Sequence, residues 1–282
     1  MELELTDQRW EHLREAVAGA STRFARLLAD CHRPDRRAVG DWSVAETAAH
    51  TAVVARLNAG LVSADPAPLG VPDLDAMWRE ASFGDFTRIN SLSNERFPYR
   101  DGGSTGRDLV ERVDVMLARS ADLDPRELRT WLGGARLPVA TMVAHQLNEV
   151  LLHGFDIAEA LGAPWPIPPE EAALAFDLFL MPLIGGDTGA LFGGGAHRGR
   201  RVLIEFRSAH TTPVLVEDGD GRIAVTAPDR AADATITFEP AALLLQIFRR
   251  TRLLATLASR GVSVSGPHPW AALDYLRRTR TP

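Results

Sequence analysis

One segment constrains the fold more than any other, the run from Val143 to Asp156, in which three metal-capable side chains recur every four residues. On an α-helix each four-residue step turns the side chain by only about 40°, so His145, Glu149 and His153 project from one face. The run is otherwise largely apolar, and a buried carboxylate is costly unless it is paired or coordinated. An earlier segment can bring His50 opposite this face from a second helix. The pattern predicts a metal held between two helices of a bundle.

The predicted ligands are two histidines and one carboxylate, a set that leaves room for water or a substrate, as catalytic metal sites do. These ligands are His50, Glu149 and His153. His145 is a competing candidate one turn earlier, because it can bind the metal, hydrogen-bond Glu149 or carry a proton. Asp156 is placed either to hold the His153 imidazole by a hydrogen bond or as an ordinary polar side chain on an exposed turn. The alternative to a metal site is a Glu/His hydrogen bond that faces solvent.

Helical periodicity dominates the first part of the chain and predicts four long amphipathic helices. The expected helices run from residue 6 to about 31–34, 43 to about 60, 104 to about 121, and 137 to 161. Ser43 and Glu46 form a capping box, and Gly162 suits a helix C-terminus. Trp42 is expected in the core rather than stacked on a ligand. Residues 63–106, rich in Pro, Gly, Asp and Asn, are expected to contain short helices and to act either as a functional lid or wall or as a plain connection.

A cluster of prolines between Pro164 and Pro169 marks the predicted domain boundary, because proline interrupts helices and strands. It places one domain at residues 1–165 and a second at 166–282. Beyond it we expect strands at 201–207, 212–217, 222–227, 234–238 and 262–265, between helices at 170–183, 240–249, 252–260 and 269–278. The predicted fold class is α followed by a small α+β domain.

Two glycine-containing features of the second half are interpreted as connections. Asp218 to Gly221 supplies a turn between two strands. The glycine clusters at 185–186 and 193–195 lack the strand-turn-helix spacing and the lysine of a phosphate-binding loop. We therefore expect a flexible loop there.

Composition narrows the class of protein. The 282 residues suffice for two domains, and a net charge of -6 does not resemble the basic footprint of a nucleic-acid-binding protein. All 31 Lys+Arg residues are arginine, which indicates a high-GC, actinobacterial coding bias. The single cysteine, Cys31, excludes an intramolecular disulfide and suits a reducing cytoplasm. The chain has no signal-like start and no apolar run of about 18 residues, so we expect a cytoplasmic protein with no membrane partner. We expect it to be a monomer or a homodimer.

Two segments carry a resemblance to a known family: Trp42 to His50 (WSVAETAAH) and Asn148 to Gly162 (NEVLLHGFDIAEALG). They are similar to the mycothiol-dependent maleylpyruvate isomerase family. The resemblance extends more weakly through 234–245 and 266–270, and so covers nearly the whole chain. It implies a DinB-like four-helix bundle followed by a sterol-carrier-protein-like domain. Matched position by position, the family's divalent-metal ligands fall on His50, Glu149 and His153.

The resemblance also implies an activity, in which a divalent metal ion, expected to be zinc, receives the thiol of the cosubstrate mycothiol. Metal binding deprotonates the sulfur, and the thiolate is the nucleophile. Attack on an activated carbon-carbon double bond of an electrophilic small molecule permits rotation and expulsion of the thiol, which is isomerisation. Retention of the thiol gives an S-conjugate, the outcome of a thiol S-transferase. The family's isomerase holds substrate carboxylates with a second-domain arginine, for which Arg201, Arg207, Arg249 and Arg250 are candidates by type.

Two other functions compete with this one. Two histidines and a carboxylate also describe non-haem iron oxygenases, so an oxidative enzyme is the first alternative. The second is a non-enzymatic carrier, in which the helical bundle and the second domain shelter an apolar ligand. In that case the metal is structural or absent.

Overall fold

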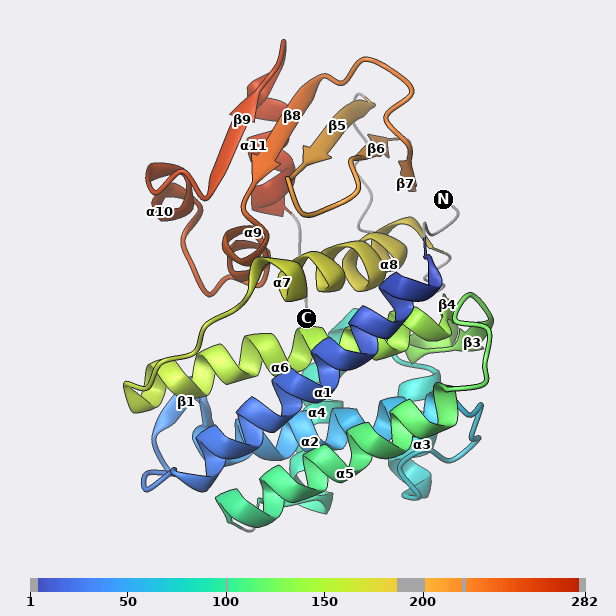
Figure 1. Cartoon of the computed structure of the whole chain (residues 1–282), viewed down its shortest axis with the longest axis vertical. Helices are drawn as coiled ribbons and strands as arrows, with labels where there is room; N and C mark the ends of the chain where they lie inside the picture. Colours follow the sequence, from blue (N-terminus) through green and yellow to red (C-terminus); the bar gives the residue numbers. More distant parts are fainter. Residues whose placement is uncertain (1–4, 100, 187–200, 220–221, 279–282) are drawn as a thin grey trace. The chain divides into compact units, whose positions relative to one another are not determined.

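The computed structural model describes residues 5–99, 101–186, 201–219 and 222–278 (Figure 1). The chain forms two compact units, which divide between Pro166 and Ile167, next to the predicted boundary. The assignment of residues 1–165 and 166–282 to two domains stays a prediction. The first unit is helical and the second combines a five-stranded sheet with helices, so the predicted class of α followed by α+β is confirmed.

Four long helices build the first unit: α1 Asp7–Ala29, α2 Val44–Leu61, α5 Gly102–Ser120 and α6 Val139–Leu161. Each packs against two others, in the order α1, α5, α2, α6, and together they close a bundle. All four were predicted, and their ends agree within two residues except for the C-terminus of α1, which ends at Ala29, before the expected 31–34. The reason is that their ends are encoded locally. The capping box of Ser43 and Glu46 is present, and Gly162 ends α6 with a φ of 69°, which glycine adopts without steric cost.

Shorter elements connect the long helices. The segment after α2 contains α3 Pro72–Arg79, the 3-10 turn η1 Phe83–Asp85 and α4 Phe86–Arg96, which confirms the predicted short helices. Two of the segments between the predicted long helices form antiparallel hairpins that the sequence patterns do not indicate. They are β1 Arg37–Val39 with β2 Trp42–Ser43, and β3 Leu128–Thr130 with β4 Arg136–Pro138, the latter enclosing η2 Leu132–Gly134. Strands of two or three residues are too short to leave a periodic signal in a sequence.

The second unit begins with a helical segment: α7 Pro169–Ala175, a π-helical turn η3 Phe176–Leu180, and α8 Met181–Gly185. Its sheet has the strand order β7-β6-β5-β8-β9. The strands are β5 Val202–Arg207, β6 Val214–Gly219, β7 Arg222–Thr226, β8 Ala234–Phe238 and β9 Val262–Ser265. Three further helices complete it: α9 Pro240–Ile247, α10 Leu253–Ala258 and α11 Pro269–Arg278.

An aromatic cluster forms the core of the second unit. Phe176 lies 4.8 Å from Phe238 and 5.9 Å from Phe206, measured between ring centroids, and Tyr275 of α11 lies 6.1 Å from Phe206. These contacts join the π-helical turn, the central strands and the last helix. All sheet neighbours are antiparallel except β5 and β8. The predicted elements of this unit are confirmed, whereas their order in the sheet was not predicted.

Some sequence expectations fall at or beyond the edge of the described residues. Gly185 ends α8 rather than lying in a loop. The glycines at 193–195 and the last two residues of the predicted turn at 218–221 lie outside the described residues. Among the residues that are described, no helix is both long and apolar enough to cross a membrane.

A close contact fixes the segment that follows α6. A Cβ atom on Gly154 would lie 2.1 Å from Cζ2 of Trp165. The indole N–H of Trp165 donates to the Leu151 carbonyl at 3.0 Å, and its ring meets Phe24 edge-on at 6.2 Å. Trp165 therefore folds back onto α6 at the one place where a side chain is missing.

Replacing this glycine tests the contact. We expect Gly154→Ala to lower the free energy of unfolding by about 1–3 kcal/mol, because the added methyl group overpacks a rigid indole. Gly19→Ala is the control in α1, where the new Cβ would meet only Arg23 Nη1 at 3.8 Å. It should be neutral or stabilise by up to about 1 kcal/mol. Urea denaturation followed by circular dichroism measures both, and equal effects of the two substitutions would contradict the contact.

Candidate metal centre

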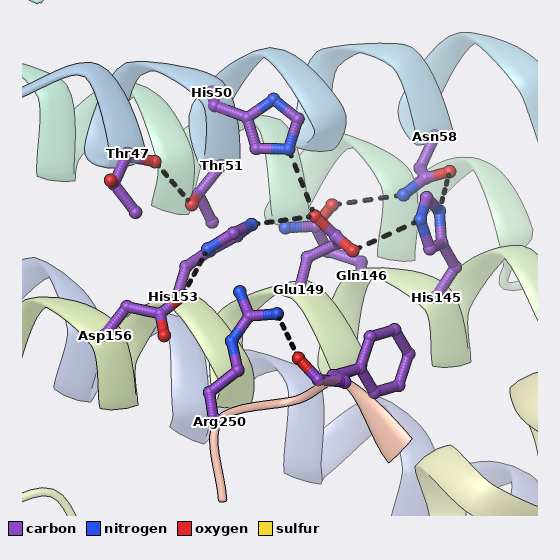
Figure 2. A network of polar contacts seen from close by, with 11 residues as sticks. Thr47, His50, Thr51, Asn58, His145, Gln146, Glu149, His153, Asp156 and Arg250 are labelled. Atoms are coloured by element: carbon purple, nitrogen blue, oxygen red, sulfur yellow. Dashed lines mark hydrogen bonds and ion pairs between the residues drawn. The ribbon is translucent and has the colours of Figure 1, made fainter. Parts of the chain in front are cut away.

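Helices α2 and α6 bring the three predicted ligands together. One ligand atom from each of His50, Glu149 and His153 lies within 4.8 Å of the others. His50 Nε2 is 3.3 Å from Glu149 Oε2, and His153 Nε2 is 3.4 Å from the same oxygen (Figure 2). The two imidazole rings meet edge-to-face with centroids 5.2 Å apart. The structure thus contains the cluster that the sequence pattern predicted.

The cluster lies in the interior of the bundle. His50 and His153 are each 8% exposed, and the Glu149 side chain is 14% exposed. Most of the neighbouring core side chains of α2 and α6 are apolar. A carboxylate in such surroundings requires hydrogen-bond donors or a cation. The alternative of a solvent-facing Glu/His hydrogen bond is wrong for this pair.

His145 contacts the other oxygen of the same carboxylate. Its Nε2 lies 3.5 Å from Glu149 Oε1, and its Nδ1 lies 3.2 Å from Asn58 Oδ1. Asn58 in turn donates to Gln146 Oε1 at 3.1 Å, and the ring of Trp131 meets the imidazole edge-on at 5.2 Å. Of the roles considered for His145, the geometry supports hydrogen bonding to Glu149. The three residues that can share an ion do not include it.

Asp156 holds the far side of His153. The two side chains meet at 3.0 Å through His153 Nδ1 and Asp156 Oδ2, and Asp156 is only 3% exposed. The predicted contact is confirmed, and the alternative of an exposed polar residue is wrong. Because Nδ1 is engaged in this way, Nε2 is the nitrogen that faces Glu149.

The position of Trp42 differs from the one that the sequence predicted. It was predicted to be a core residue, yet it is only half-buried, and its ring lies 4.9 Å from that of His50. The indole stacks at a tilt of 53° against this candidate ligand. It restricts the orientation of the imidazole from the β2 side, at the point where the capping box begins α2.

The pKa values of the three clustered residues are shifted in different ways by their surroundings. Burial lowers the pKa of His50, and the contact with Glu149 offsets this only in part. Burial acts to raise the pKa of Glu149, but hydrogen bonds from the three histidines outweigh it and hold that pKa well below its usual value. Burial acts to lower the pKa of His153 as well, whereas Asp156 and Glu149 raise it to about 9. At neutral pH the ion-free site therefore combines a carboxylate, a neutral His50 and a protonated His153.

The sequence interpretation missed the residues behind His145. Asn58 lies eight residues after His50 on α2, so helical periodicity could have placed it on the same face. Gln146 follows His145 directly, and its amide is buried. Trp131 lies outside regular periodic structure, next to η2, and no pattern marks it. These residues join the candidate centre to the hairpin of β3 and β4.

The arginine candidates for substrate binding all lie in the second unit. Arg201 pairs with Glu217 at 2.6 Å, and Arg207 pairs with Glu205 at 2.7 Å. Arg250 donates to the Phe248 carbonyl at 2.8 Å. Arg249 is exposed and has a φ of 61°. A substrate-binding role for any of them stays a prediction.

The protonated His153 gives metal binding a defined pH dependence. Metal ligands must be deprotonated, so a cation competes with the Nε2 proton of His153 below a pKa of about 9. We expect the apparent affinity for cobalt(II) to rise by up to about tenfold per pH unit between about pH 7 and 9, and to level off above. Competition with a chromophoric chelator measures it. A flat profile over this range would contradict the assignment of His153 as a ligand.

Asp156 offers a second test of the same site. We expect Asp156→Asn to weaken metal binding about 10- to 100-fold, because the carboxylate fixes the imidazole and increases its basicity. It should also move the levelling-off point to lower pH, since the Asp156 charge helps to raise the pKa of His153. Asp114→Asn, an exposed aspartate on α5, is the control. A variant that simply loosened the fold would lose affinity without shifting the pH profile.

Comparisons with known proteins identify a family and a shared fold. The family model described as mycothiol maleylpyruvate isomerase N-terminal domain matches residues 14–158. No curated protein sequence matches the chain significantly. A crystal structure of the mycothiol-dependent maleylpyruvate isomerase covers 91% of this chain and 92% of its own, at 13% identity and a TM-score of 0.50. A histidine-to-alanine mutant of that isomerase covers 93% and 94%, also at 13% identity, with a TM-score of 0.53.

At this identity the similar structures show a shared fold and nothing finer. The family match is broader evidence, because it spans slightly more than half of the 282-residue chain. It also contains all three residues of the cluster, His50, Glu149 and His153. The chain therefore belongs to the mycothiol maleylpyruvate isomerase N-terminal domain family.

Proposed function

We propose that this protein is a divalent-metal-dependent enzyme that activates a low-molecular-weight thiol for addition to an electrophilic small molecule. The observation that carries the proposal is the convergence of two imidazole nitrogens, from His50 and His153, on one oxygen of the buried Glu149. Two histidines and a carboxylate form a three-ligand set of the kind that keeps a coordination position for water or a substrate. Membership of the family and the likeness to a mycothiol-dependent isomerase favour a thiol as the incoming ligand.

The residues present fit a divalent cation. Imidazole nitrogen and carboxylate oxygen are ligands that zinc accepts, and zinc is the ion we propose. When bound, such a cation lowers the pKa of a coordinating thiol, so that the thiolate is available at neutral pH. Asp156 fixes the ring of His153 through Nδ1, and His145 holds Oε1 of Glu149. These two contacts leave His153 Nε2 and Glu149 Oε2 facing each other at 3.4 Å.

The proposed reaction begins with attack of the thiolate on an activated carbon-carbon double bond. A carbon-sulfur bond forms, and the electron pair of the double bond moves onto the adjacent carbonyl group. Rotation about the resulting single bond followed by expulsion of the thiolate restores the double bond in its other geometry. Protonation of the adduct instead yields an S-conjugate. We propose mycothiol as the thiol, and maleylpyruvate as the first electrophile to examine.

The central experiment uses the full chain loaded with zinc. Mycothiol and a panel of electrophiles that includes maleylpyruvate are added, and products are identified by mass spectrometry and chromatography. We expect a thiol-dependent isomer or conjugate, formed equally with and without oxygen. Product formation that needs oxygen and iron would favour an oxidative enzyme, since the same donor set serves non-haem iron oxygenases. No turnover of any electrophile by metal-loaded protein would favour a carrier.

Removal of the carboxylate tests the site itself. We expect Glu149→Gln to empty the metal site and to abolish thiol consumption, because the amide cannot supply the negative charge that the two imidazoles face. Glu159→Gln, at an exposed position on the same helix, is the control and should leave both unchanged. Metal content is measured by atomic spectroscopy on protein purified without chelator. Full occupancy in the Glu149→Gln variant would argue against the assignment.

A further inference from the structure

A cavity of about 220 Å³ lies in the first unit, and α2, α4 and α5 contribute to its lining. Ala49, Ala52 and Val53 of α2 form an apolar wall, Phe97 follows α4, and Arg56 provides a cationic group. The lining contains none of the residues of the metal cluster. Viewed along the axis of α2, the lining residues of this helix point about a third of a turn away from the direction of His50. The cavity is therefore a feature separate from the proposed centre.

Charge pairing around the cavity is incomplete at one residue. Arg96 is paired with Asp73 at 2.9 Å, and Asp108 is paired with Arg112 at 3.3 Å. Arg56 differs, because no carboxylate oxygen among the described residues lies within 4 Å of its guanidinium. Its guanidinium carbon lies 5.0 Å from the centroid of the Phe97 ring.

The surroundings of Arg56 are unfavourable for a cation without a carboxylate in direct contact. Arg56 is half-buried. Burial lowers its pKa most, the nearby charge of Arg112 lowers it further, and the charges of Asp108 and Glu111 offset this only in part. A ring face attracts a guanidinium but does not satisfy its five N–H donors. An anion in the cavity would supply both the missing charge and the missing acceptors.

We propose that this cavity binds the carboxylate group of a small organic acid, with Arg56 as its bidentate partner. A guanidinium presents parallel N–H groups that match the two oxygens of a carboxylate. The alanine and valine wall and the Phe97 ring would cover the apolar body of such a molecule. Inorganic phosphate, which has no apolar body, would lose hydration against this wall without compensation. The site lies outside the proposed reaction centre and does not depend on the proposed function.

Binding of benzoate to the full-length protein tests the inference, with succinate and inorganic phosphate as comparison probes and isothermal titration calorimetry as the readout. We expect saturable benzoate binding that Arg56→Gln weakens about tenfold or more, since a charge-assisted pair is lost. Arg56→Lys should give an intermediate affinity, because lysine keeps the charge but not the bidentate geometry. Arg107→Gln, an exposed arginine on α5, is the control and should bind benzoate like the parent protein.

The results of these measurements either support or overturn a carboxylate site at Arg56. Equal metal content and thermal stability in all variants would show that Arg56→Gln leaves the fold intact, and a structure with benzoate should place its carboxylate on Arg56. Binding of phosphate alone would overturn the assignment to organic acids. The absence of saturable binding by both carboxylates, or equal carboxylate binding by the parent and Arg56→Gln, would overturn the site. No thiol is present in these measurements, so their result is separate from that of the enzyme assay.

Discussion

The interaction on which the helical unit depends is the one between the buried carboxylate of Glu149 and the three imidazoles around it. A lone carboxylate in an apolar interior is costly, and here the donors come from both α2 and α6. The contacts work only when the two helices lie side by side in one register. The same interaction therefore constrains the packing of the bundle and assembles the candidate metal centre.

The two oxygens of the Glu149 carboxylate have different partners. Oε2 faces His50 and His153, whereas Oε1 faces His145. The residues behind them continue this division, since Asp156 fixes His153 and Asn58 contacts His145. The residues around the carboxylate are buried, so the packed interior and not solvent determines the orientation of these side chains: His50, His145, His153, Asn58 and Asp156. Support of this kind would hold the three candidate ligands in place for an ion, as the proposed thiol chemistry requires.

Much of the helical unit was predictable because its signals are local. The capping box at Ser43 and Glu46, the glycine at position 162 and the four-residue spacing from His145 to His153 each act within a few residues of the chain. The pairing of β5 with β8 is different. Nothing in either strand indicates that they are parallel neighbours while all other pairs are antiparallel. The hairpin of β3 and β4 likewise depends on pairing between segments too short to show a period.

The sequence by itself determined the long helices, their ends, the α then α+β organisation and the three side chains that can share an ion. Tertiary structure alone decided that His145 contacts one oxygen of Glu149 and that the Trp42 ring packs against His50. It also decided that Arg56 lines a cavity without a carboxylate partner in direct contact. The physical reason is the distance along the sequence over which each interaction acts. Helical periodicity and capping arise from hydrogen bonds and side-chain spacing within a few residues, whereas these contacts join side chains that only the packing of separate elements brings together.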